Sequence, residues 1–194
     1  TSSGIHGDPL NMAIVASEED LNHLMLEAGW IPADPITFAS CVKISAATVL
    51  RRMYQQAPVS SLMLFGRKQD LAYQQPVGGD PSRRHHVRFW RAPMEVEGQP
   101  VWIGAATYDR SVGLSHTTLQ VTHHIDGDVD AERDHLLDNW RQTGRLQDFY
   151  WLDDFHKDRE GKNGGGDRYF TDGRLLVAFA MNRASGPGAN SDIP

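Results

Sequence analysis

Five short runs of β-branched and aromatic residues recur between residues 62 and 125, and no other feature of the chain limits the fold as strongly. The runs cover residues 62–65, 71–75, 85–91, 101–108 and 119–125, and glycine, proline and aspartate separate them. Residues 97–100, Glu-Gly-Gln-Pro, have the composition of a tight turn between the third and fourth runs. Because a short connection makes neighbouring strands antiparallel, the pattern predicts an antiparallel meander.

Segments with the apolar spacing of helices lie on both sides of this meander. Ser17 followed by three acidic residues is typical of a helix start, and Gly29 is expected to end that helix. Residues 37–53 and 130–143 predict two more helices. Further strands are expected at residues 11–16, 146–151 and 175–180. The chain is therefore expected to adopt an α+β fold, a mostly antiparallel or mixed sheet with about three helices packed on one face.

Length and composition indicate one folded domain. The chain has 194 residues, 40% hydrophobic and 23% charged, and we expect a single domain over residues 8–182 between flexible tails at 1–7 and 183–194. The net charge of −6 argues against nucleic-acid binding, which needs a cationic surface. No apolar run is long enough to span a membrane, and residues 1–9 lack the apolar core of a signal peptide.

Histidines concentrate in the second part of the chain, where seven of the nine follow residue 84. Two adjacent pairs, His85-His86 and His123-His124, lie in strand-type runs, where solvated loop histidines are not expected. Side chains alternate across a strand, so each pair sends one ring to each face of the sheet. One ring of each pair can therefore reach a site on a common face.

The alternation of apolar residues predicts which ring of the first pair faces the core. In the run 85–91, His85 shares a face with Val87 and Phe89. This leaves His86, Arg88 and Trp90 on the opposite, polar face, where Trp90 is expected to be exposed. We expect His85 to be a hydrogen-bonded structural residue, because buried polar groups find partners.

The same reasoning applies to the fourth and fifth runs. In residues 119–126 it places His123 with the apolar series, and His124 and Asp126 on the opposite face. In residues 101–108 it places Trp102 and Gly104 on the polar face. There, Trp102 is expected to be exposed, and Gly104 to leave room for a ligand.

These assignments predict a site on one face of the sheet, to which the connecting loop adds Asp109 and His116. Two or three imidazoles with one carboxylate suit zinc or another divalent metal with open positions for water. The predicted metal ligands are His86, His116, His124 and Asp126. Asp109 and His116 are the predicted catalytic residues, with Asp109 as a base or as an orienting group.

An anionic substrate is expected beside this centre. Arg84 and Arg88 belong to a local cluster of positive charge in an acidic chain, and guanidinium groups capture phosphate or carboxylate through paired hydrogen bonds. Gly165 and Gly166 are predicted to add backbone amides around the anion. The glycine run 164–166 is alternatively a flexible turn or lid next to the site.

Eight segments of the chain resemble, in the same order, those of a known family. They lie at residues 8–11, 58–60, 64–70, 84–88, 104–110, 114–116, 122–126 and 164–167. Over most of residues 8–180 the chain is similar to the LssY carboxy-terminal domain family. The family pattern coincides with His86, Arg88, Asp109, His116, His124 and Asp126, and it assigns no catalytic role to them.

The resemblance implies a bacterial protein connected with the cell envelope, in the cytoplasm or at the inner membrane. Domains of this family occur alone or behind inner-membrane modules, including modules that resemble lipid-phosphate phosphatases. A lipid headgroup or another anionic small molecule is the partner that this association implies.

Three functions fit these features. The first is a metal-assisted hydrolase of a phosphoester or another anionic, lipid-derived substrate. The second is a non-catalytic ligand-binding or sensory domain for an anionic headgroup or nucleotide. The third is a metal-free phosphoesterase in which His116 works with His86 or His124 as acid and base.

Overall fold

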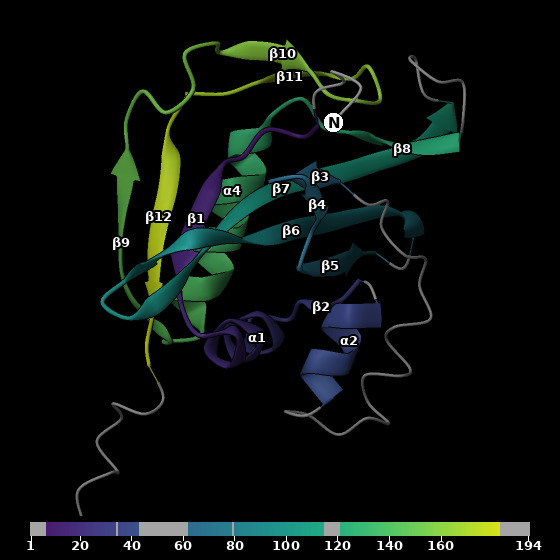
Figure 1. Cartoon of the computed structure of the whole chain (residues 1–194). Helices are drawn as coiled ribbons and strands as arrows, with labels where there is room; N and C mark the ends of the chain where they lie inside the picture. The colour runs from purple at the N-terminus through teal and green to yellow at the C-terminus, as the bar shows by residue number, and fades with distance from the viewer. Residues whose placement is uncertain (1–6, 34, 43–61, 79, 115–120, 183–194) are drawn as a thin grey trace, which may run out of the picture.

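A computed structural model describes residues 7–33, 35–42, 62–78, 80–114 and 121–182 of the chain (Figure 1). Its centre is an eight-stranded sheet in the order β2-β5-β6-β7-β1-β12-β9, with β8 paired to β7. The strands of this sheet are β1 (Met12–Val15), β2 (Ile31–Pro32), β5 (Leu71–Val77), β6 (Asp80–Val96), β7 (Gln99–Leu114), β8 (Val121–Ile125), β9 (Leu146–Leu152) and β12 (Leu175–Ala180). Two small hairpins lie outside it, β3 (Met63–Leu64) with β4 (Arg67–Lys68), and β10 (Glu160–Lys162) with β11 (Arg168–Phe170).

The helices begin at the caps that the sequence contains. The described helices are α1 (Glu18–Glu27), α2 (Pro35–Val42) and α4 (Val129–Gln142). Ser17 Oγ accepts a hydrogen bond from the N–H of Asp20 at 3.0 Å, and Asp128 Oδ1 accepts one from the N–H of Ala131 at 3.0 Å. The predicted α+β fold is confirmed. The predicted second helix also covers residues 43–53, which lie outside the described residues.

The later runs of the predicted meander form the sheet, whereas the run 62–65 contributes β3 to a separate hairpin and not to the meander. Strands β5, β6, β7 and β8 follow one another and pair antiparallel. Glu97 and Gly98, with φ angles of 52° and 74°, form the turn between β6 and β7. The sheet is mixed because β1 pairs with β12 in parallel and with β7 antiparallel. The first and last strands of the described chain therefore lie side by side in the middle of the sheet (Figure 1).

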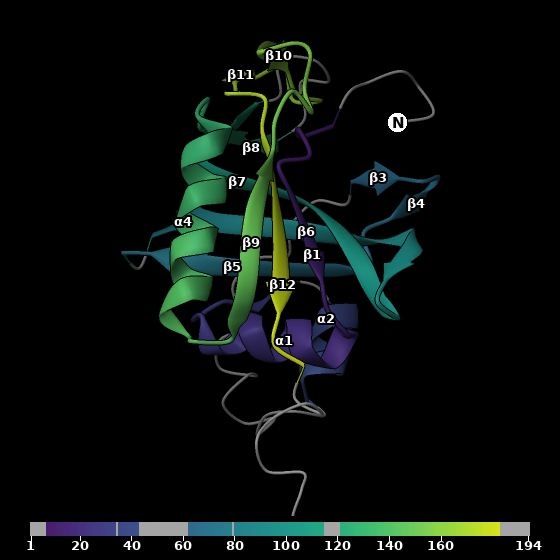
Figure 2. The ribbon, with the colours of Figure 1, turned by 90° about the vertical axis from the view of Figure 1, so that its left-hand side faces the viewer.

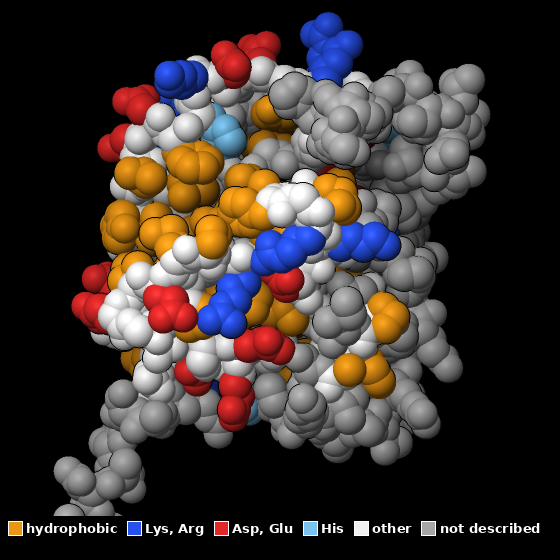
Figure 3. Space-filling model, viewed as in Figure 1, with side chains coloured by type: hydrophobic (Ala, Val, Ile, Leu, Met, Phe, Trp, Pro, Cys, Tyr) orange, Lys and Arg blue, Asp and Glu red, His pale blue; other side chains and the backbone are white. Residues whose placement is uncertain are grey.

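Apolar side chains from the sheet and from all three helices form the main core. Val87, Phe89 and Trp140 are fully buried in this layer, with α4 on one side of the sheet (Figure 2). A smaller apolar cluster around Ala13 lies on the other face of the sheet. Figure 3 views that other face, where apolar side chains gather over β9 and β12, and Tyr150 of β9 is 51% exposed.

The predicted faces of β6 are confirmed, whereas those of β7 are wrong. Gly104 pairs with Phe89 of β6, and Trp102 packs into the main core. A Cβ atom at Gly104 would lie 2.7 Å from Met12 Cγ and 2.8 Å from Phe89 Cε1. The glycine therefore permits close packing of the core and leaves no room for a ligand. Trp102 and Trp90 of β6, both predicted to be exposed, are 2% and 1% exposed.

Candidate functional site

A row of buried polar side chains lies on the face of β6 and β7 opposite the main core. β6 contributes Arg84, His86 and Arg88 at alternate positions, and these residues are 4%, 2% and 3% exposed. β7 contributes Thr107 and Asp109, which lie opposite His86 and Arg84 in the strand register. Asp109 therefore lies within a strand and not in the connecting loop, where it was expected. The register thus brings together four of the predicted site residues, Arg84, His86, Arg88 and Asp109, on one face.

The side chains of this row contact one another directly. Arg84 Nε donates to Asp109 Oδ2 at 3.0 Å, and Arg84 Nη1 donates to Gln74 Oε1 of β5 at 3.0 Å. His86 Nε2 and Thr107 Oγ1 form a hydrogen bond of 2.8 Å. His86 Nδ1 lies 3.2 Å from Asp109 Oδ1, without the alignment of a hydrogen bond. His86 is therefore enclosed between a hydroxyl and a carboxylate.

Arg88 connects this row to the segment that precedes β1. Its Nη1 donates to Asp8 Oδ2 at 3.2 Å, and Asp8 Oδ1 accepts a hydrogen bond from Asn163 Nδ2 at 3.2 Å. Burial lowers the pKa of Arg88 from its ordinary value, and the carboxylates of Asp8 and Asp109 counteract this effect. The ion pair with Asp8 therefore helps to keep Arg88 charged in the interior.

His124 of β8 forms a separate pair with Asp167. His124 Nδ1 lies 2.7 Å from Asp167 Oδ1, and the N–H of Ile125 donates to Asp167 Oδ2 at 3.2 Å. Because the carboxylate accepts from Nδ1, the neutral ring carries its lone pair on Nε2. The side chain of His124 is 14% exposed, against 3% for His86, so His124 is the more accessible of the two histidines.

Asn163 organises the glycine-rich loop that carries Asp167. Asn163 Oδ1 accepts hydrogen bonds from the N–H groups of Gly165 at 3.0 Å and Asp167 at 2.9 Å. The carbonyl of Asn163 accepts from the N–H of Gly166 at 3.0 Å. The amides that are predicted to hold an anion thus donate to Asn163 in this conformation. Anion binding by Gly165 and Gly166 stays a prediction.

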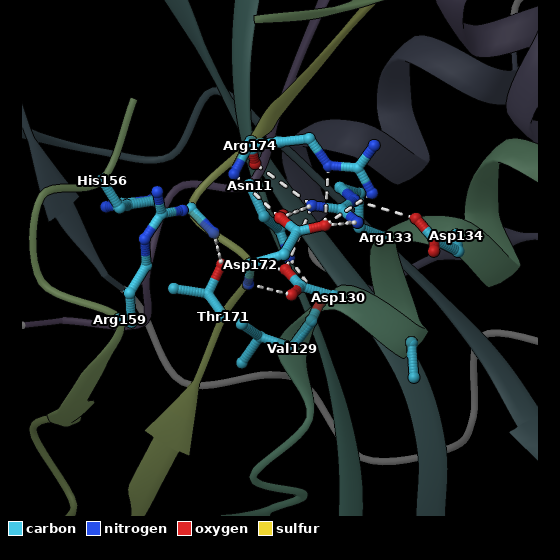
Figure 4. A network of polar contacts seen from close by, with 12 residues as sticks. Asn11, Val129, Asp130, Arg133, Asp134, His156, Arg159, Thr171, Asp172 and Arg174 are labelled. Atoms are coloured by element: carbon cyan, nitrogen blue, oxygen red, sulfur yellow. Dashed lines mark hydrogen bonds and ion pairs between the residues drawn. The ribbon is translucent and has the colours of Figure 1, made fainter. Parts of the chain in front are cut away.

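A cluster of ion pairs fastens the segment between β11 and β12 to the start of α4 (Figure 4). Arg133 Nη1 and Nη2 reach the two carboxylate oxygens of Asp172 at 3.0 and 3.1 Å, and Thr171 Oγ1 donates to Asp130 Oδ1 at 2.9 Å. Burial raises the pKa of Asp172, but hydrogen bonds from Arg133 and Arg174 outweigh it and hold this pKa below its usual range. These contacts fix the segment between β11 and β12 against α4.

The predicted metal ligands occupy different positions along the sheet. His86 lies on β6 and His124 on β8, with β7 between them, and each ring has its own carboxylate. Asp126 Oδ1 accepts from the N–H of Asp128 at 3.0 Å, in the turn before α4. His116 lies outside the described residues. Within those residues, no group of three or more His, Cys, Asp or Glu side chains is arranged to hold a metal ion, and the metal site stays a prediction.

Four polar residues of this region are absent from the sequence-based assignment: Asp8, Thr107, Asn163 and Asp167. The family resemblance at residues 8–11 and 164–167 contains a signal for Asp8 and Asp167. Thr107 shares strand parity with Asp109, and it becomes a site residue once the register of β7 is known. Asn163 belongs to the polar loop before the glycine run, where composition alone indicates only a turn.

A separate polar cluster lies on the opposite face, between β6 and α4. His85 Nδ1 lies 2.7 Å from Glu132 Oε2, and the His85 ring stacks on that of His135 at a centroid distance of 4.1 Å. His135 Nε2 and Gln75 Oε1 form a hydrogen bond of 2.9 Å. His85 is thus a hydrogen-bonded residue against the core, as expected.

Acidification is expected to destabilise the fold through His135. Burial lowers the pKa of His135 and the neighbouring His85 lowers it further, while Glu132 and Asp138 act in the opposite direction. The folded state therefore binds this proton less tightly than the unfolded state, so its stabilisation is present above the unfolded pKa of about 6.5 and is lost as the pH falls below that value. Urea unfolding at about pH 7.5 and about pH 5.5 measures the loss. His135→Gln cannot take up this proton, and an unchanged pH dependence in that variant would contradict the assignment.

A family model described as the LssY C-terminus matches residues 1–175 of the chain. The matched span contains both the buried row on β6 and β7 and the pair of His124 with Asp167. No curated protein and no solved structure matches the chain. Among the described residues, no helix combines the length and the apolar character needed to cross a membrane.

Proposed function

The chain belongs to the LssY C-terminus family, and we propose that it hydrolyses an ester of an anionic substrate with His124 as acid and base. The 2.7 Å contact between His124 Nδ1 and Asp167 Oδ1 carries this proposal. A carboxylate at Nδ1 orients the ring and directs Nε2 to the reaction. There, Nε2 takes a proton from the attacking water and returns it to the leaving alcohol, while the remaining hydroxide joins the phosphoryl or acyl group.

Basic side chains near this pair support an anionic substrate. Arg88 is joined through Asp8 to Asn163, and Asn163 in turn accepts from the N–H of Asp167. A guanidinium binds the oxygens of phosphate or carboxylate through charge-assisted hydrogen bonds. A phosphoester, lipid-derived or soluble, is therefore the substrate class that we favour. Arg84 lies farther along the same row, where its guanidinium is paired with Asp109.

A divalent metal belongs to a second version of this proposal, in which His124 is a metal ligand instead of the acid and base. In that version the ligands are His86, His116, His124 and Asp126, and zinc is the expected metal. Metal-binding histidines usually donate their second ring nitrogen to a carboxylate, and the contact of His124 with Asp167 has this form. When bound, the metal supplies a hydroxide at neutral pH by lowering the pKa of its water. In this version Asp109, whose Oδ1 lies 3.2 Å from His86 Nδ1, would be the carboxylate that orients His86.

Hydrolysis of a panel of phosphoesters by the whole chain tests the proposal. Asp167→Asn is expected to reduce turnover about 10–100-fold, because an amide no longer fixes the tautomer of His124. Asp158→Asn is the matched control, since Asp158 is an exposed residue outside this site, and it should keep wild-type turnover. If the wild-type chain binds these compounds and hydrolyses none of them, the ligand-binding alternative replaces the hydrolase.

Chelation separates the two catalytic versions. Turnover that a chelator abolishes and zinc restores supports the metal-assisted version. Turnover that survives chelation supports acid and base catalysis by histidine alone. Elemental analysis uses protein purified without an affinity histidine tag, because the measured metal must come from the chain itself.

A further inference from the structure

The carboxylate of Asp8 is bound in the way that proteins bind the oxyanion of a ligand. Asp8 Oδ2 accepts from Arg88 Nη1 and Asp8 Oδ1 accepts from Asn163 Nδ2, each at 3.2 Å. One guanidinium and one amide, from segments far apart in the sequence, thus hold the two oxygens of one carboxylate. The side chain of Asp8 is 9% exposed and that of Arg88 is 4% exposed, so Asp8 is the outer partner.

The segment that carries Asp8 is attached independently of this contact. Asp8 precedes β1, and Asn11 anchors the segment to the sheet three residues later. Asn11 Nδ2 donates to the carbonyl of Ala106 at 2.9 Å, and the N–H of Ala106 donates to Asn11 Oδ1 at 3.0 Å. Asp8 can therefore leave Arg88 without unpairing β1 from its neighbours.

The contact of Asp8 with Asn163 is connected by hydrogen bonds to the pair of His124 and Asp167. Asn163, which donates to Asp8, accepts from the N–H of Asp167 at 2.9 Å, and Asp167 holds His124. An oxyanion in the place of the Asp8 carboxylate would therefore be linked to His124 through the loop that Asn163 organises.

We propose that Arg88 and Asn163 form a binding site for an oxyanion group, phosphate or carboxylate, of a ligand, and that Asp8 occupies this site when the ligand is absent. The inference names the anion subsite of the proposed function and rests on it. A buried guanidinium needs a counter-anion, because an unpaired charge removed from water is costly. The ligand oxyanion and Asp8 therefore compete for the same two donors, and Asp8 weakens anion binding in the wild-type chain.

Asp8→Ala tests this competition, because it removes the internal carboxylate and keeps both donors. Calorimetric titration with inorganic phosphate should show binding about tenfold or more tighter for Asp8→Ala than for the wild-type chain. Adding Asn163→Ala to this variant should weaken binding again, because one donor is lost. Equal phosphate affinity in wild type and Asp8→Ala would overturn the proposal. So would an affinity of Asp8→Ala that does not change when Asn163→Ala is added.

Two further variants keep the test decisive. Asp70→Ala removes the partner of Arg67 from an ion pair of 2.7 Å near the surface, and it should leave phosphate binding unchanged. If Asp8→Ala does not fold, Asp8→Asn, which keeps the shape and removes the charge, must show the same contrast with wild type. Phosphate binding without turnover of any ester would preserve this site and remove the hydrolase, so the two proposals fail separately.

A second arm distinguishes the sources of the oxyanion. Phosphatidylcholine vesicles with and without phosphatidate present a lipid phosphate to the Asp8→Ala chain. If the chain sediments with vesicles that contain phosphatidate and not with vesicles that lack it, the site binds a lipid headgroup. Phosphate binding without sedimentation would assign it to a soluble ligand.

Discussion

Replacing Asp109 with alanine is expected to lower the free energy of unfolding by about 3–5 kcal/mol. Asp109 is 1% exposed and accepts a hydrogen bond of 3.0 Å from Arg84 Nε, and Arg84 itself is 4% exposed. Without this carboxylate, the Arg84 charge stays in the interior, and the neutral side chain of Gln74 cannot compensate it. Urea unfolding followed by tryptophan fluorescence measures the change.

Two variants show whether the lost charge is the cause. Asp154→Asn removes the charge from an ion pair of 2.8 Å with Arg159 on the surface, and asparagine tolerates the φ of 54° at this position, so the variant should change the free energy of unfolding by less than about 1 kcal/mol. Asp109→Asn keeps the shape of the side chain and should still be clearly destabilised. A loss at Asp109 no larger than the loss at Asp154 would mean that the buried ion pair does not support the fold.

His124→Gln is expected to reduce kcat/KM about 10²–10⁴-fold on the ester that the wild-type chain hydrolyses best, which is the usual contribution of a positioned acid and base. The expectation follows from the proposed role of His124 Nε2, which Asp167 orients through Nδ1. Glutamine retains a hydrogen-bonding amide and cannot exchange a proton at neutral pH. Steady-state kinetics, with circular dichroism to confirm folding, provide the measurement.

His23→Gln is the matched control for this experiment. His23 lies on α1, where its Nε2 is 3.9 Å from Glu19 Oε1, and it takes no part in the buried row or in the pair of Asp167. Turnover of this variant should equal that of wild type. Wild-type turnover in a folded His124→Gln chain would remove His124 from the mechanism.

The sequence predicts the faces of β6 because only one of its two faces is apolar. Val87 and Phe89 enter the main core, while His86 and Arg88 alternate with them on the opposite side. A polar residue at every second position is a clear period of two, and the structure confirms the assignment. The helix cap at Ser17 is another local signal of this kind, because the hydroxyl of Ser17 is adjacent in sequence to the helix that it caps.

The faces of β7 could not be predicted, because both of them are apolar in the middle of the sheet. Trp102 packs into the main core, while Val101 belongs to the smaller cluster on the other face. A strand that is buried on both sides has no polar residues to mark one face, and its periodicity cannot choose. The decisive fact is the pairing of Gly104 with Phe89, which depends on the whole sheet.

The residues of the candidate site that share one strand could be predicted from the sequence, whereas their partners from distant segments could not. Strand parity gathers Arg84, His86 and Arg88, which share one strand. The partners of this row come from distant segments, since Asp8 lies 80 residues before Arg88, and Asp167 lies 43 residues after His124. Such contacts depend on chain topology, and strand alternation contains no information about them.

The parallel pairing of β1 with β12 has a consequence for how the domain is made. β1 leaves the ribosome well before its neighbour β12, which is the last strand of the described chain. Among the described strands, β1 can pair only with β7 until β12 emerges, and β9 has no strand to pair with. Contacts between such distant segments form slowly. The nascent domain therefore waits with exposed strand edges, a state in which chaperones bind and aggregation begins.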